Sequence, residues 1–156
     1  MSAPTPTLHD CLLHETAEVA QFTELLEAEA AALDDGLTPE QLQSLTDRKT
    51  ASAQRLQELA NRRDALLAGL GLPGGHDGTD HAAAADAQVG QAWARLLEAS
   101  DRARQLNARN GALIDTHLRH TRRSLDILRE IAGISNVYDA KGRSHSIQSG
   151  KKIAAT

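Results

Sequence analysis

Apolar residues recur at helical spacing over about 50 residues in the second half of the chain. Between about Ala83 and about Ala132, they follow one another at steps of three, four or seven residues, or sums of these: Val89, Trp93, Leu96, Ala103, Ile114, Leu118, Leu125 and Leu128. This spacing keeps the side chains on one face of an α-helix, and no proline interrupts the segment. We therefore predict one long helix over 83–132, which at 1.5 Å per residue spans roughly 75 Å.

Two shorter helical patterns precede the long one. The first, over 8–34, carries Leu12, Val19, Phe22, Leu26, Ala30 and Leu33, and the second, over 39–69, carries Leu42, Leu45, Leu56, Leu59, Leu66 and Leu70. Gly36 supplies the left-handed conformation that commonly ends a helix. Thr38, Pro39 and Gln41 then match a capping box with proline at the first helical position. Because the connection is about four residues long, we predict an antiparallel helical hairpin.

The three predicted helices differ in length. The first two reach only about 40–47 Å, so the hairpin is too short to cover the third. We expect one end of the third helix to extend beyond the hairpin, and the end after Gly111 is the one we favour. The glycine-rich stretch after the second helix predicts a flexible loop over 71–82. The fold class is therefore all-α: an antiparallel hairpin plus one long third helix, in an elongated three-helix bundle.

The chain beyond Gly133 lacks helical periodicity. Residues 134–156 are polar and carry four Lys or Arg against one acid, Asp139. Such a composition predicts a disordered C-terminal tail, flexible and basic. We therefore expect one helical domain over 1–133, followed by this tail over 134–156.

Polar residues interrupt the apolar pattern of the second and third helices. They are Lys49, Ser52 and Arg63 in the second helix and Asn107 and Asn110 in the third. Polar residues at such positions weaken packing and fix register, or extend their charged ends to the rim. Gly111 costs about 1 kcal/mol relative to alanine inside a helix, and we interpret it as a point of close helix crossing. The acid pairs Glu15/Glu18 and Glu24/Glu27 are interpreted as a charged surface.

Composition narrows the class of protein. A chain of 156 residues is long enough for one domain with a real core, and its single Phe, Trp and Tyr argue against a β-sandwich. Cys11 is the only cysteine, so an intramolecular disulfide is excluded and we expect a cytoplasmic protein. We expect no secretion signal, and no apolar run reaches about 18 residues, so membrane insertion is not expected either.

Charge is unevenly distributed along the chain. Residues 1–37 carry eight acids and no Lys or Arg, whereas residues 101–156 carry eleven Lys or Arg against five acids. This polarity favours packing of the first helix against the third. A nucleic-acid binder acting through the basic end is an alternative, but no recognised motif accompanies the charge.

Candidate chemistry is sparse. We find no glycine-rich phosphate loop, no di-iron Glu-x-x-His pair and no cysteine-based metal site. His76, Asp77, Asp80 and His81 would be metal ligands only if a rigid frame held them. Asp115, His117 and His120 are typical of a solvated helix face. Catalysis needs a concave and partly dry site, and a chain of three long helices offers no obvious one. We therefore expect neither an enzyme nor a cofactor.

Three segments in this order resemble the FlgN family of flagellar type III export chaperones. The first helix contains Leu-Glu-Ala-Glu-Ala-Ala-Ala-Leu at 26–33. The second contains Lys49 and Leu-Gln-Glu-Leu-Ala-Asn-Arg-Arg at 56–63, and closes on Leu-Gly-Leu at 70–72. The third contains Asn-Ala-Arg-Asn-Gly-Ala-Leu-Ile at 107–114, followed by Tyr-Asp-Ala-Lys-Gly at 138–142. The resemblance covers roughly residues 8–143.

The resemblance implies a small cytosolic chaperone that binds hook–filament junction proteins, the hook-associated proteins FlgK and FlgL, before export. In this family the C-terminal amphipathic part binds the client, and a tyrosine near that end takes part in docking at the export gate protein FlhA. The implied client-binding residues are Ile114, Leu118, Thr121, Leu125, Leu128 and Ile131. Tyr138 is the implied gate-docking residue.

The residues alone lead to a compatible expectation. An exposed apolar face on a helix suits binding of a client helix, and it can also associate with itself in the absence of client. The alternative is a structural coiled-coil protein whose function is oligomerisation. The polar interruptions in the second and third helices argue against one long uninterrupted coil.

Overall fold

The computed structural model describes residues 6–131, together with the backbone of 136–138 and 144–146. Its helices are α1 (Leu8–Asp35), α2 (Pro39–Gly69), α3 (Gly75–Ala85) and α4 (Ala87–Ile131), and its strands are β1 (Asn136–Tyr138) and β2 (Ser144–Ser146). The chain divides into two compact units, residues 1–113 and residues 114–156, and α4 contributes to both. The predicted all-α class, with a helical hairpin and a long later helix, is confirmed.

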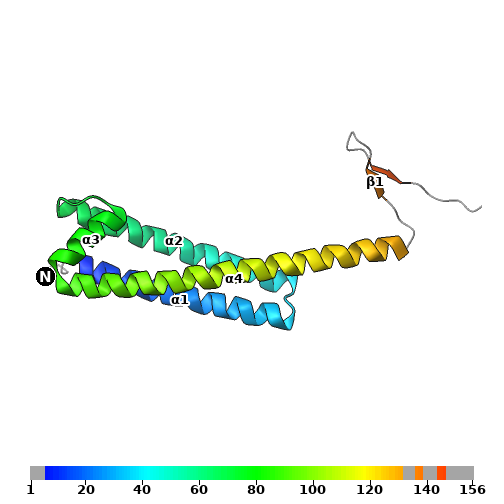
Figure 1. The fold of residues 1–156 in the computed structure, drawn as a ribbon, viewed down its shortest axis with the longest axis horizontal. Coiled ribbons are helices and arrows are strands. Elements are labelled where there is room, and N and C mark those ends of the chain that lie inside the picture. Colours follow the sequence, from blue (N-terminus) through cyan, green and yellow to red (C-terminus); the bar gives the residue numbers. More distant parts are fainter. Residues whose placement is uncertain (1–5, 132–135, 139–143, 147–156) are drawn as a thin grey trace, which may run out of the picture. The chain divides into compact units, whose positions relative to one another are not determined.

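In the first unit α1 and α2 form the predicted antiparallel hairpin, and α3 lies at the end of the hairpin opposite the α1–α2 turn (Figure 1). Gly36 in the turn has a φ of 84°. The capping box at the start of α2 is confirmed: Thr38 Oγ1 accepts from the Gln41 N–H at 3.2 Å, and Gln41 Oε1 accepts from the Thr38 N–H at 3.0 Å. Both bonds satisfy N–H groups that a helix start leaves unpaired.

The start of α1 has a capping box that the sequence analysis did not identify. Thr7 Oγ1 accepts from the Asp10 N–H, and Asp10 Oδ2 accepts from the Thr7 N–H, each at 3.1 Å. Hydrogen bonds from Thr7 hold the pKa of the Asp10 carboxyl below its usual value. The first two helices thus begin with the same kind of cap.

The predicted loop over 71–82 is wrong for most of its length, because residues 75–85 form α3. Gly75 has a φ of 77°, and its N–H donates to Asp64 Oδ1 of α2 at 2.8 Å. A Cβ on Gly78 would lie 1.6 Å from the carbonyl oxygen of Pro73. This glycine therefore allows α3 to fold back closely on its own leading segment.

The long helix begins later than predicted, at Ala87 instead of residue 83. Asp86 has an extended backbone (φ −138°, ψ 119°), so it separates α3 from α4. Its Oδ1 accepts from the N–H groups of Gln88 at 2.8 Å and Val89 at 3.2 Å, as an N-cap does. Residues 83–85 accordingly belong to the short helix, and the long one has 45 residues.

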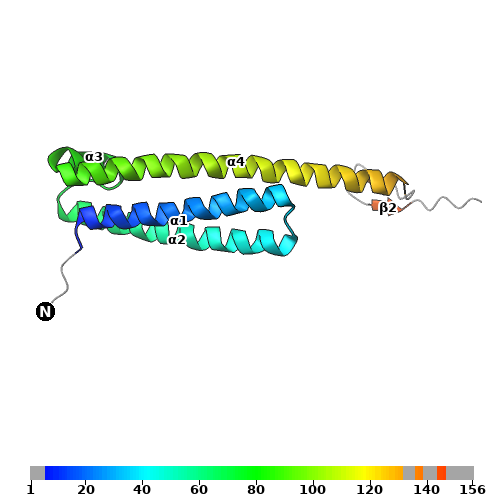
Figure 2. The ribbon, with the colours of Figure 1, turned by 90° about the horizontal axis from the view of Figure 1, so that it is seen from below.

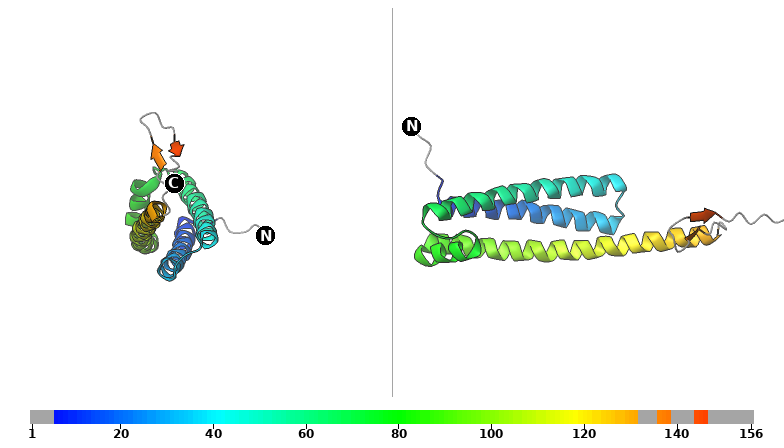
Figure 3. Two further views of the ribbon diagram at one scale, coloured as in Figure 1. Left: turned by 90° about the vertical axis from the view of Figure 1, so that its right-hand side faces the viewer. Right: turned by 90° about the horizontal axis from the view of Figure 1, so that it is seen from above.

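One apolar core joins the four helices of the first unit. Its buried members are Leu8, Leu12, Val19 and Leu26 from α1, Leu67 from α2, Ala82 from α3, and Val89, Ala92, Trp93, Leu96 and Ala103 from α4. The first part of α4 runs beside α1 in Figure 2, and the right panel of Figure 3 shows α1 and α2 joined by their short turn. α1 and α4 supply most of the buried members of this core, and α2 adds the partly buried Leu56 and Leu66.

Gly111 has no packing role of the predicted kind. Leaving aside the backbone of its own helix, no atom of the described residues lies within 4 Å of the position that a Cβ would take there. The interpretation of Gly111 as a close helix crossing is therefore wrong.

The second unit contains residues 114–131 of α4 and the strand pair. β1 and β2 pair in antiparallel fashion, with Val137 opposite His145. We expected no regular structure after residue 133, so this pairing is a departure; Val137 and Tyr138 are residue types that favour strands. The other residues of the predicted tail lie outside the described ones, and the predicted domain boundary at 133 stays a prediction.

Candidate partner-binding surface

α4 carries one apolar face that runs through most of its sequence. Counted at roughly 100° per residue, the following positions lie within about 80° of one another on the helix: Val89, Leu96, Ala103, Asn110, Ile114, Leu118, Thr121, Leu125 and Leu128. The first four of these are buried. We call the later set the α4 stripe, defined as Ile114, Leu118, Thr121, Leu125, Leu128 and Ile131; Ile131 lies roughly 60° outside the edge of the face.

Most of the α4 stripe is exposed. Leu125 and Leu128 are 48% and 60% exposed, Leu118 and Ile131 are also exposed, and Ile114 is half-buried. Thr121 is exposed, and its hydroxyl donates to the carbonyl oxygen of His117 at 3.0 Å, a bond within its own helix. A helix face that is buried in one half and bare in the other is a candidate surface for a partner.

Ile127 is a further exposed apolar residue, which the sequence analysis did not select. It is 50% exposed, close to the value for Leu125, but it lies roughly 160° around the helix from Leu125. Helical spacing does not select it, because it lies away from Leu118 and Leu125; within the stripe only Ile131, about 40° away, lies beside it. Ile127 therefore provides a matched comparison for Leu125.

The rest of this segment is charged and solvated. Arg129 lies 3.8 Å from Asp126 in an exposed pair, which contributes little to stability. Asp115, His117 and His120 are all exposed. Between residues 6 and 131, no group of three or more His, Cys, Asp or Glu is placed to hold a metal ion.

The four residues considered as metal ligands at 76–81 have structural contacts. Asp80 Oδ1 accepts from Trp93 Nε1 at 2.7 Å. The His76 ring meets the Trp93 ring edge-on, with ring centroids 5.0 Å apart. His81 Nδ1 lies 2.7 Å from the carbonyl oxygen of Asp77. The contacts of Asp80 and His76 with Trp93 attach α3 to α4, whereas the contact of His81 lies within α3.

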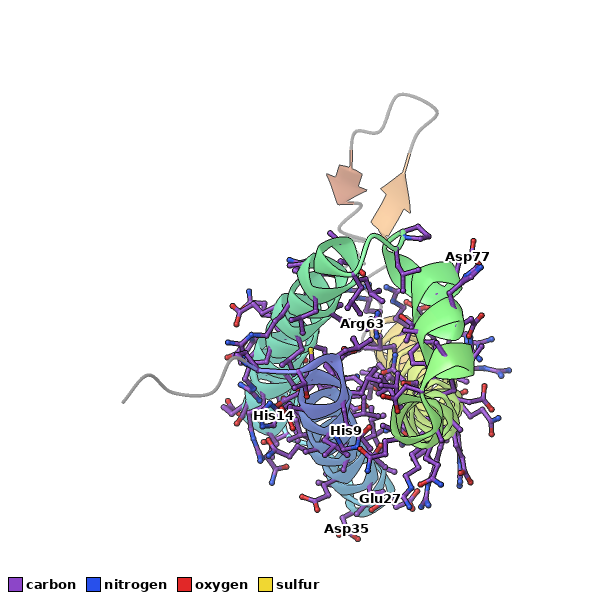
Figure 4. The ribbon with its side chains drawn as sticks, turned by 90° about the vertical axis from the view of Figure 1, so that its left-hand side faces the viewer. His9, His14, Glu27, Asp35, Arg63 and Asp77 are labelled. Atoms are coloured by element: carbon purple, nitrogen blue, oxygen red, sulfur yellow. The ribbon has the colours of Figure 1, made fainter. Side chains whose placement is uncertain are left out.

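Ion pairs and hydrogen bonds join α1 and α2 along their interface, and we call this set of contacts the polar seam. It consists of Arg63–Glu15 at 2.7 Å, Arg55–Glu18 at 2.9 Å, Ser52–Glu18 at 2.8 Å and Lys49–Glu29 at 3.2 Å. Glu15 is only 5% exposed, so its assignment to a charged surface is wrong. Figure 4 shows Arg63 directed between the helices, where it also lies 5.4 Å from the centre of the Trp93 ring. The polar interruptions of α2 are therefore partners for acids of α1.

Burial changes two titratable groups in this seam. It raises the pKa of the Glu15 carboxyl above its usual 4.5, although Arg63 acts in the opposite direction. Burial, with the nearby Glu15 charge, raises the pKa of the Cys11 thiol to about 11. The thiol is therefore neutral near pH 7 and a poor nucleophile.

Tyr138 ends β1. Its side chain lies outside what the structure describes, so the gate-docking role stays a prediction. Within residues 6–131, no helix is long and apolar enough to cross a membrane.

Comparisons with known proteins agree with this architecture. The family described as FlgN protein matches residues 1–146. A crystal structure from Pseudomonas aeruginosa, assigned as flagella synthesis protein FlgN, is similar with a TM-score of 0.59 and 28% identity, covering 72% of this chain and 90% of that chain. No curated protein matches the chain. The family is a non-enzymatic family of flagellar proteins, which connects the chain with flagellar assembly. Since the match spans nearly the whole sequence, the chain belongs to the FlgN family.

Proposed function

We propose that this chain is a cytoplasmic export chaperone that binds the hook-associated proteins FlgK and FlgL before flagellar type III secretion. The client-binding surface in this proposal is the α4 stripe. Family membership supports the role in flagellar assembly, and the bare apolar face of α4 supports the choice of surface.

One observation carries the proposal. The same helical face that α4 buries at Val89, Leu96 and Ala103 is bare at Leu118, Leu125 and Leu128. An amphipathic helix of a client can bury such a face in the way that helices bury one another in a bundle. The mechanism needs only non-covalent burial, so it includes no nucleotide, metal or other cofactor.

The stripe residues supply only part of the binding free energy. Covering a half-exposed leucine contributes about 1 kcal/mol, half of what full burial contributes. Four such residues of the stripe would supply about 4 kcal/mol, which by itself corresponds to a Kd of about 1 mM and does not offset the entropic costs of association. The apolar side chains that the client buries against the stripe must therefore contribute as well.

The test compares two full-length variants with the unmodified chain. Leu125→Ser combined with Leu128→Ser removes about 2 kcal/mol of apolar burial, which corresponds to a roughly 30-fold weaker Kd for purified FlgK or FlgL. Ile127→Ser, equally exposed but on another face, is expected to change Kd less than about threefold. Circular dichroism checks that both variants stay helical. Equal binding by the stripe variant and the control would reject the surface.

Self-association is the alternative use of the same face, as in a structural coiled-coil protein. Light scattering over a wide concentration range separates the two functions. A stable oligomer that FlgK and FlgL do not dissociate favours oligomerisation, whereas a monomer that forms a client complex favours the chaperone.

Tyr138 is proposed separately as a docking residue for the export gate protein FlhA. Tyr138→Ala is expected to weaken binding to FlhA while leaving binding to FlgK unchanged, because the α4 stripe is intact. Unchanged binding to FlhA would remove this residue from the proposal.

A further inference from the structure

Asn110 is the last buried residue of α4 among those described, and it is polar. Its amide Nδ2 donates to the carbonyl oxygen of Leu26 at 2.7 Å and to Glu29 Oε1 at 3.0 Å, both in α1. Glu29, itself 1% exposed, also accepts from Lys49 Nζ of α2 at 3.2 Å. One buried amide therefore completes a hydrogen-bonded chain that crosses α1, α2 and α4.

The amide of Asn110 is only partly satisfied. Asn110 Oδ1 is buried and has no hydrogen-bond partner in the part of the chain that the structure describes, and an unpaired buried acceptor costs stability. The two bonds from Nδ2 act in the opposite direction, because without them the buried Glu29 carboxylate and the Leu26 carbonyl would each lose a donor. These acceptors are found at one place on α1, so the bonds depend on how α4 is aligned with α1.

The spacing of α4 also permits other registers, in which the leucines after Asn110 would face the bundle. Before Asn110, the packed face includes small residues such as Ala92 and Ala103. After it, the same face carries the larger Leu118 and Leu125. All of them share one helical spacing, so spacing alone would permit α4 to slide or rotate on α1. An asparagine is satisfied only opposite its acceptors, and a single buried asparagine can specify helix register at a cost in stability.

We propose that Asn110 is a positioning residue that holds α4 in one axial and rotational register on α1 and α2. The register determines which residues of α4 the bundle buries, and so keeps the leucines of the α4 stripe for a partner. The claim that the stripe is kept for a partner rests on the proposed function, whereas the claim that Asn110 fixes the register does not.

The first experiment measures register without any client. Nitroxide labels replace the exposed pair Glu27 and Arg102, whose side chains meet at 3.2 Å across α1 and α4, and spin–spin broadening reports their separation. Asn110→Leu is expected to lower the urea midpoint, because Glu29 and the Leu26 carbonyl lose a donor, and to broaden the distribution of separations. Asn107→Leu is the matched control, since Asn107 is exposed and three residues away; it is expected to keep one narrow distribution.

The second experiment adds purified FlgK to the same unlabelled variants. If only about a tenth of the Asn110→Leu molecules hold the binding register, the apparent Kd rises about tenfold, and Asn107→Leu binds as the unmodified chain does. If the unmodified chain does not bind FlgK, the proposed function fails, but the labels still decide the register. A single narrow distribution for Asn110→Leu overturns the proposal.

Asn110→Ala covers the case in which leucine is too large for the site. It removes the amide without adding volume, and we expect it to broaden the distribution in the same way. A narrow distribution for Asn110→Ala, or a failure of both variants to fold, contradicts the proposed role, because the amide would then stabilise the fold instead of selecting its register.

Discussion

The same substitution at two glycines is expected to have opposite effects on stability. Gly78 and Gly111 are both inside helices, so alanine gains about 1 kcal/mol of helix propensity at either site. At Gly111 the new methyl group would meet no described atom within 4 Å, other than backbone of its own helix. At Gly78 it would lie 1.6 Å from the carbonyl oxygen and 2.7 Å from the carbonyl carbon of Pro73. A backbone clash cannot be relieved by a side-chain rotation.

The loss of stability expected for Gly78→Ala depends on which contacts break when α3 is displaced. Displacing α3 moves Ala82 within the core to which Leu67 also belongs and weakens the 2.7 Å hydrogen bond from Trp93 to Asp80. A hydrogen bond to a charged group contributes about 1.5–3 kcal/mol, and overpacking costs about 1–3 kcal/mol. After the gain in propensity, we expect Gly78→Ala to destabilise the chain by about 2–4 kcal/mol.

The assay is urea and thermal unfolding of both full-length variants, followed by circular dichroism and by the fluorescence of Trp93, the only tryptophan. Gly111→Ala is expected to raise Tm by about 3–5 °C and Gly78→Ala to lower it by about 10 °C. Trp93 emission should change in the folded state of Gly78→Ala alone. If Gly78→Ala is as stable as the unmodified chain, the account of how α3 is seated is wrong.

Three further predictions concern α1 and α2. Cys11, with a pKa of about 11, should react with iodoacetamide at pH 8 only as fast as the chain unfolds; rapid labelling of the folded protein would contradict its burial. Glu15 binds its proton more tightly folded than unfolded, so its contribution to stability is fully present below pH 4.5 and is lost as pH rises through the raised folded pKa. Glu15→Gln should therefore reduce the dependence of the urea midpoint on pH above pH 4.5, and an unchanged pH profile would argue against this assignment. Thr38→Ala should cost about 1 kcal/mol through loss of the capping box, measured by urea unfolding, and no loss would show that the cap contributes nothing.

The hairpin could be predicted because its signals are local. Gly36, Thr38, Pro39 and Gln41 act within a few residues of one another, and the structure contains the turn and the cap they predict. The capping box at Thr7 was equally local, but its third position is an aspartate, Asp10, instead of the usual Glu or Gln.

α3 could not be predicted, because its stability depends on residues far away in the sequence. Glycine and aspartate between 74 and 80 favour a loop when only neighbours are considered. The helix is held by Asp64 of α2 and Trp93 of α4, 11 and 13 residues from their partners. Such contacts become visible only when the helices are packed.

The residues that α2 contributes to the polar seam could be predicted, but their partners in α1 could not. Its cations on α2 stood out as interruptions of an apolar pattern, but nothing in the sequence paired Arg63 with Glu15 across 48 residues. The sequence predicts a role in helix register for Asn110 without indicating its acceptors, and the packing role that it predicts for Gly111 is wrong. The exposure of Leu125 and Leu128 agrees with the expectation of a bare stripe, whereas its client stays a prediction.

Amide hydrogen exchange of the full-length chain, with and without saturating FlgK, tests the central claim most directly. Covering the α4 stripe should suppress opening of the helix beneath it, so exchange should slow in peptides within 114–131 and change little in those of α1 and α2. Protection confined to the hairpin, with residues 114–131 exchanging as fast as in the free chain, would contradict the account.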